Sequence, residues 1–342
     1  MNLSLQNILK VIKYGTLPVL IFLVVILTVD YIFSEWIIFN KDFSNQAKLR
    51  RLIEHNEANE IPIFGSSKAR SSFIPDSISR YAYNYAMEAS NFDVIEFLLD
   101  IECKKDKSTS IILEFNQSFF VHSPDYTINA ATFIPNLNYN FVKDFLIKND
   151  RFEFQFLLPG FRYFGFYFYY ARFLLKKDFG TKKIISKGGN FAKLVPKKEV
   201  FQNYVNARLR ADKTRRLYLN KRNDIKKAIS AEESLILDYL NRTLLFSANE
   251  ERIKVFEDFF IKNPDRTFLV VYTPQHWSEL KMVSNYNEIL ELFDSWEKRF
   301  PNLKVFNYAN MDLDDDCFKD SSHLNIKGAR IFCSQFHSDA WF

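Results

Sequence analysis

Short apolar runs alternate with stretches of helical periodicity along most of the chain. Five runs have the length and composition of buried strands, at residues 61–64, 81–86, 111–115, 267–272 and 303–307. Apolar residues recur at helical spacing between these runs and after them, over residues 92–102, 249–263, 286–300 and from 326 onward. This order predicts an α/β fold, namely a flavodoxin-like three-layer α/β/α sandwich with a parallel sheet.

A longer apolar run at residues 16–33 is sufficient to cross a bilayer when its flanks are included. Lys10 and Lys13 precede it, and Tyr31 and Trp36 suit the membrane interface at its other end. Neither a small-residue cleavage site nor a Leu-x-x-Cys lipobox follows, so we interpret the run as an uncleaved anchor in the lipid bilayer. A cleaved signal peptide is the alternative. The positive-inside rule predicts a single-pass protein with a cytoplasmic N-terminus and a periplasmic, or otherwise extracytoplasmic, main domain.

The alternation of strands and helices lapses between residues 119 and 249. A stretch of this length must carry structure of its own, so we expect a mostly helical insertion. The insertion belongs to a domain of residues 38–342, which follows the cytoplasmic tip and anchor at residues 1–37. Residues 40–59 are polar and are expected to form a stalk or a first helix before the first strand.

The insertion has an aromatic part and a basic part. Residues 152–175 are densely aromatic, but Arg162, Arg172 and Pro159-Gly160 disfavour a second span, so we expect a core or membrane-surface helix. Residues 176–222 are rich in Lys and Arg, which is typical of a solvated face or of a surface for anionic lipid headgroups or an acidic polysaccharide. Nucleic acid is not an expected partner, because the predicted topology places this segment outside the cell.

Composition adds little to this interpretation. The net charge is +5 over 342 residues, so an argument from charge must be local. The 37 Phe residues indicate packing, or surfaces for sugars or membranes, and do not name a reaction. The cysteines, Cys103, Cys317 and Cys333, lack metal-ligand spacing and allow one disulfide at most. Cys317 lies near Asp320 as a possible thiol nucleophile, although a buried or incidental cysteine is the commoner case. No metal or cofactor is expected.

The candidate chemistry begins where the first strand ends, at Gly65-Ser66-Ser67. A strand that ends in Gly and small hydroxyl residues turns sharply and exposes a side-chain oxygen at the carboxyl edge of the sheet. Ser67 is therefore the candidate nucleophile, and it needs a base and an orienting acid. The sequence Asp320-Ser321-Ser322-His323 supplies both, because Asp320 can reach one ring nitrogen of His323 while the other faces Ser67.

These two stretches together resemble the first and last blocks of the SGNH (GDSL-like) hydrolase superfamily, which read Gly-Asp-Ser and Asp-x-x-His. Ser66 stands where that family usually has Asp, a departure that resembles its membrane-anchored, cell-envelope branches. In the family, a second block of Asn and Gly and a third block with Asn complete an oxyanion hole. By position, Asn84 and Ala89 correspond to the second block, and Asn116 to the third.

The resemblance implies a role for each of these residues. Ser67, Ala89 and Asn116 would form the oxyanion hole, the first two through backbone N–H groups. Ala89 stands where the family has Gly, so a positive φ there would be costly. His276 and Trp277 follow the fourth predicted strand and are expected, with Asn84, to bind substrate. His276 and His122 are also rival bases to His323, and Glu114 is expected to be a bystander or a substrate-facing residue.

The resemblance implies a membrane-anchored serine acyltransferase or esterase that acts on O-acyl groups of a cell-envelope polysaccharide or a related polymer. Similar proteins acetylate or D-alanylate envelope polymers beside a membrane-bound O-acyltransferase, which is therefore an expected partner. A simple carbohydrate or lipid esterase is the nearest competitor. A protein of another class, a catalytically inactive envelope protein of the same fold that binds a glycan or a membrane complex, also fits the incomplete second and third blocks.

Overall fold

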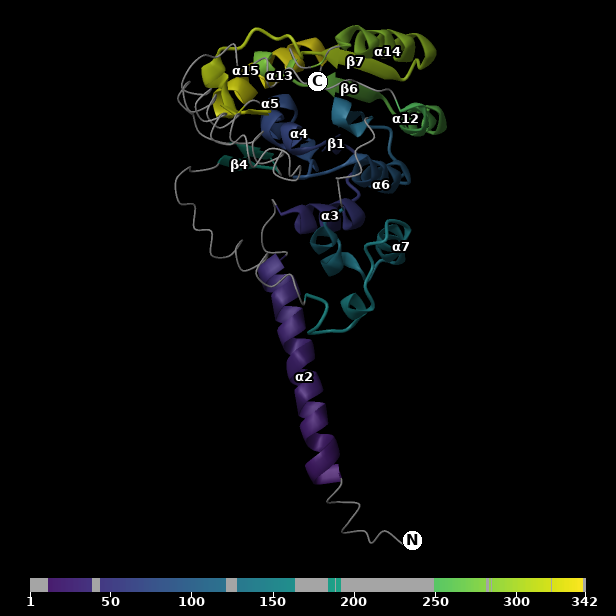
Figure 1. Ribbon diagram of the computed structural model, residues 1–342, viewed down its shortest axis with the longest axis vertical. Helices are drawn as coiled ribbons and strands as arrows, with labels where there is room; N and C mark the ends of the chain where they lie inside the picture. Colours follow the sequence, from purple (N-terminus) through teal and green to yellow (C-terminus); the bar gives the residue numbers. More distant parts are fainter. Residues whose placement is uncertain are drawn as a thin grey trace, which may run out of the picture. The chain divides into compact units, whose positions relative to one another are not determined.

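The computed structural model describes residues 12–38, 44–120, 128–163, 184–187, 189–191, 249–280, 283, 285–320 and 322–340 (Figure 1). Most of the basic stretch at 176–222, and His122, lie outside these residues. The chain forms two compact units. One comprises residues 1–51 and 128–179, and the other comprises residues 52–127 and 180–342. Residues 128–163 thus group with the apolar N-terminal helix, and the sheet belongs to the other unit.

The sheet unit contains five parallel strands, as the apolar runs predict. Their order in the sheet is β2 (Ala82–Asn84), β1 (Ile61–Phe64), β3 (Ile111–Glu114), β6 (Phe268–Tyr272) and β7 (Leu303–Asn307). This is the order of a doubly wound sheet, in which the direction of winding reverses between β1 and β3. Residues that follow β1, β2, β3 and β6 therefore meet at one edge of the sheet.

One face of the sheet packs against the helices α4 (Ser67–Ser72), α5 (Pro75–Ile78) and α15 (Ile326–Ala340) (Figure 1). Alternate strand residues and helix residues form one buried cluster, which includes Ile63, Ile112, Leu269, Val271, Phe73, Phe332 and Phe336. Side chains two apart in a strand lie on the same face, so every second residue of a strand, such as Leu269 and Val271 in β6, points into this layer.

The opposite face packs against α6 (Phe92–Cys103), α12 (Glu250–Lys262) and α14 (Tyr286–Arg299). Aromatic rings make much of this layer: Phe260 contacts Phe268 with ring centroids 5.0 Å apart, and Tyr272 contacts Phe293 at 6.2 Å. Edge-to-face pairs of this kind add stability beyond the area that they bury. The abundant Phe residues therefore serve the core, as their number predicts, and the α/β architecture is confirmed.

Shorter elements complete the sheet unit. They are η3 (Gln117–Phe119), β4 (Ile184–Ser186), β5 (Gly189–Phe191), α13 (Trp277–Leu280), η9 (Asp315–Cys317), β8 (Phe318–Asp320) and β9 (His323–Leu324). The pairs β4–β5 and β8–β9 are antiparallel hairpins. The three cysteines are free thiols, so the disulfide that the sequence allows is absent from the structure.

The other unit begins with a continuous helix made of η1 (Ile12–Thr16), α2 (Leu17–Ile32) and η2 (Phe33–Ile38). Residues Tyr14–Glu35 are long and apolar enough to cross a membrane, although a signal sequence would satisfy the same criterion. This confirms the predicted apolar helix and leaves its topology open. The unit also contains most of α3 (Asn45–Glu54), up to Arg51, and η4 (Ala130–Thr132), η5 (Ile134–Asn136), α7 (Asn140–Lys148) and η6 (Phe154–Leu157).

The helix expected over residues 152–175 is not present in the part of it that is described. Residues 154–157 form one 3-10 turn, and further turns follow up to Tyr163. Gly160 has a φ of +78°, a conformation that a right-handed helix does not contain. The Pro159-Gly160 sequence accounts for this outcome, since Pro lacks an N–H and Gly tolerates the left-handed region. Residues 164–175 lie outside the described part of the chain.

The tight turn after β1 generates a first prediction. A Cβ added at Gly65 would lie 2.5 Å from a carboxylate oxygen of Glu114 and 2.5 Å from the Cβ of Ala69. We therefore expect Gly65→Ala to lower the free energy of unfolding by about 1–3 kcal/mol, the range of overpacked cores. Thermal melting of the full chain in detergent measures the change.

Gly15→Ala is the matched control, because a Cβ at Gly15 meets nothing within 4 Å. Equal melting temperatures for the two variants would contradict the close packing at Gly65.

Candidate active site

The turn that presents Ser67 is built from residues 64–68. β1 ends at Phe64, and Gly65 follows with a φ of +155°. Ser66 caps helix α4, with its hydroxyl accepting a hydrogen bond from the Lys68 N–H at 3.2 Å. Ser67 is thus the first residue of α4, at the carboxyl end of β1, where open α/β sheets commonly place their sites.

Ser67, His323 and Asp320 form a continuous hydrogen-bonded chain. The Ser67 Oγ lies 2.9 Å from His323 Nε2, and His323 Nδ1 lies 2.7 Å from Asp320 Oδ1. The Ser322 N–H also donates to Asp320 Oδ1 at 3.0 Å, which orients the carboxylate. Residues 256 positions apart therefore stand in the geometry of a nucleophile, its base and an orienting acid.

The electrostatics of Asp320 favour this arrangement. Burial alone would raise the pKa of Asp320, but the hydrogen bond and charge of His323, with the charge of Lys319, outweigh burial and hold the pKa below its ordinary value. The carboxylate is therefore ionised near neutral pH. An ionised Asp320 favours the tautomer of His323 with its proton on Nδ1, which leaves the Nε2 lone pair for the Ser67 hydroxyl.

Glu114 holds the turn before Ser67 through hydrogen bonds to Ser66, a role that the sequence did not predict. Its carboxylate is almost completely buried and accepts hydrogen bonds from the Ser66 N–H at 2.6 Å and the Ser66 hydroxyl at 2.9 Å. Burial raises the pKa of Glu114, against the effect of these hydrogen bonds and of Lys68. Of the two roles expected for Glu114, its burial excludes the substrate-facing one, and its hydrogen bonds to Ser66 make it a supporting residue rather than a bystander. Position 66, where the SGNH superfamily usually has Asp, is Ser in this chain. The Ser66 hydroxyl donates to the Glu114 carboxylate at the end of β3.

The three expected oxyanion donors lie around the same sheet edge. The Met87 N–H donates to the Gly65 carbonyl at 3.2 Å and so ties the segment before Ala89 to the nucleophile turn. The Asn116 amide donates to the Ser66 hydroxyl at 3.2 Å, so it also lies at this turn. The oxyanion hole of Ser67, Ala89 and Asn116 therefore stays a prediction.

The expected substrate-binding residues differ in their exposure. Asn84 is fully buried, and its side chain binds the backbone of Ala69, Phe73 and Ala86, so it holds α4 against β2 and leaves no surface for a ligand. His276 is also buried, beside Asp315, which removes it from contact with a substrate as well.

Trp277 is the member of this set that reaches the surface. Its side chain is 37% exposed, and its indole N–H donates to Asp315 at 3.1 Å. His276 lies against its ring at 5.2 Å. Burial lowers the pKa of His276 against the effect of Asp315, which keeps this imidazole in its neutral form. The hydrogen bond and the ring contact hold the indole in one orientation.

A polar network that sequence reasoning missed joins the nucleophile turn to the His323 hairpin. The Lys68 ammonium lies 2.6 Å from Gln275 Oε1 and 2.8 Å from Glu279 Oε2, and Glu279 also accepts a hydrogen bond from the Ser322 hydroxyl. Lys68 and Glu279 are 211 positions apart, so no local pattern indicates this pair. The network fixes α13 and the β8–β9 hairpin against α4.

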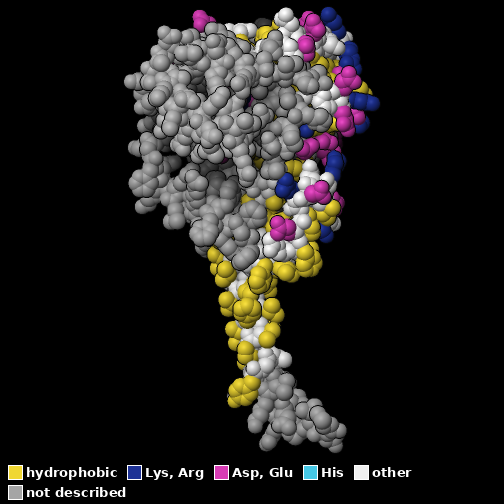
Figure 2. Space-filling model, viewed as in Figure 1, with side chains coloured by type: hydrophobic (Ala, Val, Ile, Leu, Met, Phe, Trp, Pro, Cys, Tyr) yellow, Lys and Arg dark blue, Asp and Glu magenta, His cyan; other side chains and the backbone are white. Residues whose placement is uncertain are grey.

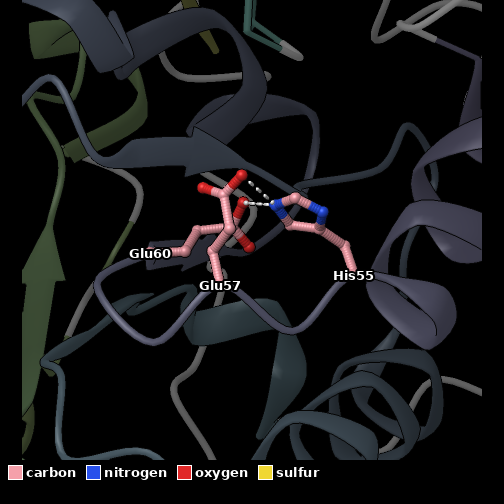
Figure 3. A group of neighbouring side chains, drawn as sticks. All are labelled: His55, Glu57 and Glu60. Atoms are coloured by element: carbon pink, nitrogen blue, oxygen red, sulfur yellow. Dashed lines mark ion pairs between the residues drawn. The ribbon is translucent and has the colours of Figure 1, made fainter.

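One group of described side chains has the spacing of metal ligands. His55 Nε2 lies 3.1 Å from a Glu57 oxygen and 3.4 Å from a Glu60 oxygen (Figure 3). The spacing suits one metal ion or an imidazolium between two carboxylates. Glu60 directly precedes β1, whereas Ser67 follows it, so this group lies at the opposite edge of the sheet from Ser67.

Comparison with known proteins does not assign a family. No protein-family model matches the chain, and no curated protein matches its sequence. Function is therefore inferred from the side chains of this site. The resemblance to SGNH hydrolases stays an expectation that rests on the motifs named above.

The backbone at Ala89 generates a second prediction. Ala89 is exposed and has a φ of +57°, in the left-handed region that disfavours every residue with a Cβ. We expect Ala89→Gly to raise the free energy of unfolding by about 1 kcal/mol, because the relief of strain outweighs the greater freedom of Gly in the unfolded chain. Melting temperatures of the two proteins measure this difference, and a lower value for Ala89→Gly would contradict it.

The lowered pKa of Asp320 generates a third prediction. A carboxylate whose folded pKa is depressed stabilises the fold above its unfolded pKa, about 3.9, and this stability is lost as the pH falls through the folded pKa. The stability gap between the unmodified protein and Asp320→Asn should therefore be largest near neutral pH and shrink below about pH 4. Melting curves across this range measure the gap, and a constant gap would contradict the shift.

Proposed function

We propose that this protein is a membrane-anchored serine acyltransferase or esterase. The observation that carries the proposal is the hydrogen-bonded chain from Ser67 through His323 to Asp320. A serine hydroxyl is a poor nucleophile unless a base removes its proton as it attacks. The arrangement of these three side chains supplies that base and keeps it correctly oriented.

In the first half of the reaction, the Ser67 oxygen attacks the carbonyl carbon of an acyl ester. His323 Nε2 accepts the Ser67 proton, and the resulting imidazolium is stabilised by the Asp320 carboxylate. The carbonyl oxygen gains the negative charge, and the Ser67 and Ala89 N–H groups with the Asn116 amide are the proposed donors to it. The tetrahedral intermediate then collapses, the ester C–O bond breaks, and His323 returns the proton to the departing alcohol.

In the second half, an acceptor hydroxyl attacks the acyl-Ser67 ester. His323 takes the proton of that hydroxyl and then gives it to the Ser67 oxygen as the acyl group leaves. Water as the acceptor makes the protein an esterase, and a sugar hydroxyl makes it a transferase. Both outcomes use the same three side chains, so the choice depends on what the site holds beside the acyl group.

The proposed substrate is an O-acylated cell-envelope polysaccharide or a related polymer. Trp277 supports a sugar ligand, because an exposed and firmly held indole offers a flat apolar face with a polar edge. The apolar helix at the N-terminus supports a site held close to a membrane. The proposed topology has a cytoplasmic N-terminus and an extracytoplasmic sheet unit, and the proposed partner that delivers the acyl group is a membrane-bound O-acyltransferase.

The strained Ala89 is the observation that favours the second candidate, a non-catalytic protein that binds a glycan or a membrane complex. A family glycine replaced by Ala at positive φ fits a site no longer under selection for rate. Against it stands the intact hydrogen bonding of Ser67, His323 and Asp320, each of which would be unnecessary in a binding protein. We therefore favour the enzyme.

Acyl-enzyme formation tests the proposal and is the fourth prediction. The full chain in detergent is incubated with an activated acetyl ester, and the mass of the intact protein and of its peptides locates any adduct. We expect an acetyl group on Ser67, and at least about a thousandfold slower ester cleavage by Ser67→Ala. Addition of oligosaccharides then separates transfer from hydrolysis.

Ser77→Ala is the matched control, because Ser77 is an exposed serine of the neighbouring helix α5. It should retain both the adduct and the rate. A folded protein that forms no adduct, or one that forms it equally in Ser67→Ala, would overturn the enzyme and favour the binding protein.

A further inference from the structure

The apolar helix contains one acidic residue, and that residue is tied to a distant part of the chain. Asp30 is 5% exposed although it lies within the candidate span. Its carboxylate accepts hydrogen bonds from the Gly160 N–H at 2.9 Å and from Arg162 Nε at 2.8 Å, and it forms an ion pair with the Arg162 guanidinium. Asp30 and Arg162 thus neutralise each other in a setting where an unpaired charge would be expensive.

Two further contacts fasten the same segment to the helix. The Ser34 hydroxyl lies 2.5 Å from the Tyr163 hydroxyl, and the Phe33 and Tyr163 rings are 5.0 Å apart. A Cβ on Gly160 would collide with the side chain of Ile26, so the backbone there lies directly against the helix. Ile26 is nine residues before Glu35, the end of the span, which corresponds to about 14 Å along a helix. The turn therefore reaches well into the length of the apolar helix.

The segment of residues 154–161, which contains this turn, carries four exposed apolar side chains. Phe154 is 72% exposed, Phe161 51%, Leu158 42% and Leu157 41%. Four such residues within eight positions form an apolar surface that a soluble protein rarely leaves uncovered. Hydrophobic side chains also line the helix itself and continue around its upper end in Figure 2.

We propose that residues 154–161 dip into the lipid bilayer beside the second half of α2, in the leaflet where that helix ends. The inference rests on the anchoring role proposed for α2, and it goes beyond it by assigning a second element to the membrane. The bilayer is the occupant because the exposed apolar side chains continue the lipid-facing surface of α2 at the same depth. The Asp30–Arg162 pair allows both segments to enter without a net charge.

The backbone of the dipping turn is compatible with this position. Non-helical backbone inside a membrane needs hydrogen-bond partners or the cover of protein. The Gly160 N–H is satisfied by Asp30, and the Leu158, Phe161 and Arg162 N–H groups donate to carbonyls within the segment. The sequence allowed a membrane-surface helix over residues 152–175. The proposal assigns the contact with the membrane to the short turn at residues 154–161 instead.

Lipid and water accessibility of single spin labels tests the proposal. The full chain is reconstituted in zwitterionic lipid vesicles with a label at Leu157→Cys, at Val24→Cys within the span, or at Lys254→Cys on the exposed face of α12. Burial raises the pKa of Cys103 and of Cys333 to about 12, and it also raises the pKa of Cys317, so the native thiols react slowly. The unmodified chain measures any labelling of them.

The label at Leu157 should collide with oxygen as often as that at Val24, and several-fold less often with a water-soluble nickel chelate than that at Lys254. A label at Leu157 that behaves like Lys254, while Val24 reports lipid, would overturn the dipping turn and leave the anchor intact. A label at Leu157 closed to both reagents would assign the surface to a second copy and also overturn it. Water exposure at Val24 would overturn the anchor itself, independently of the chemistry at Ser67.

A charge cycle supplies an independent test and is the fifth prediction. Asp30→Asn and Arg162→Gln each leave one charge unpaired, so each should lower the melting temperature in vesicles more than the double variant does. If the melting-temperature shifts of the two single variants simply add in the double variant, the Asp30–Arg162 pair lies in water, as at an ordinary protein surface. That result would overturn the placement of this segment in the membrane. Gly160→Ala should also reduce the lipid exposure of the Leu157 label, because its Cβ collides with Ile26.

Discussion

The site depends on the close approach of Gly65 and Glu114. No side chain fits at Gly65, because the carboxylate of Glu114 and the Cβ of Ala69 occupy its place. This contact lets the Glu114 carboxylate bind both the N–H and the hydroxyl of Ser66, which fixes the first turn of α4. The position of the Ser67 hydroxyl follows from that turn. A buried carboxyl group thus acts on the nucleophile without touching the reacting atoms.

The second half of the site is held by ionic contacts. The β8–β9 hairpin is too short to position His323 by backbone pairing alone. Ser322 connects it to Glu279, which in turn pairs with Lys68, the residue after the nucleophile. The base is thus fixed relative to the serine through a path that bypasses the Ser67–His323 hydrogen bond. Such preorganisation is what the proposed acyl transfer would need, because groups that are already in place cost no rearrangement at the moment of reaction.

Most of the sheet could be predicted from the sequence, because each strand is a short apolar run that ends in turn residues. The meeting of Ser67 with Asp320 and His323 was expected from the turn after the first strand, the Asp-x-x-His spacing and the resemblance to the SGNH blocks, although the antiparallel β8–β9 hairpin that carries the last two was not. The sequence showed Glu114 as an acid at the end of a buried strand, but it did not show that the side chain points inward to Ser66. Glu279 gave no signal, because its contact with Lys68 depends on packing between distant elements. The helix expected at residues 152–175 failed in its described part, where Pro159 and Gly160 outweighed the aromatic pattern.

Asp30 and Arg162 show why the two explanations of the apolar helix are not equivalent. Considered alone, Asp30 is a charge that a membrane-spanning helix tolerates near its end. Arg162, considered alone, disfavours a second membrane-spanning helix. Together they form an ion pair, with Gly160 and Tyr163 as further contacts to the helix. Removal of the helix as a signal peptide would leave the Arg162 guanidinium, the Gly160 N–H and the Tyr163 hydroxyl without these partners. The contacts therefore support the proposed uncleaved anchor over the alternative of a cleaved signal peptide.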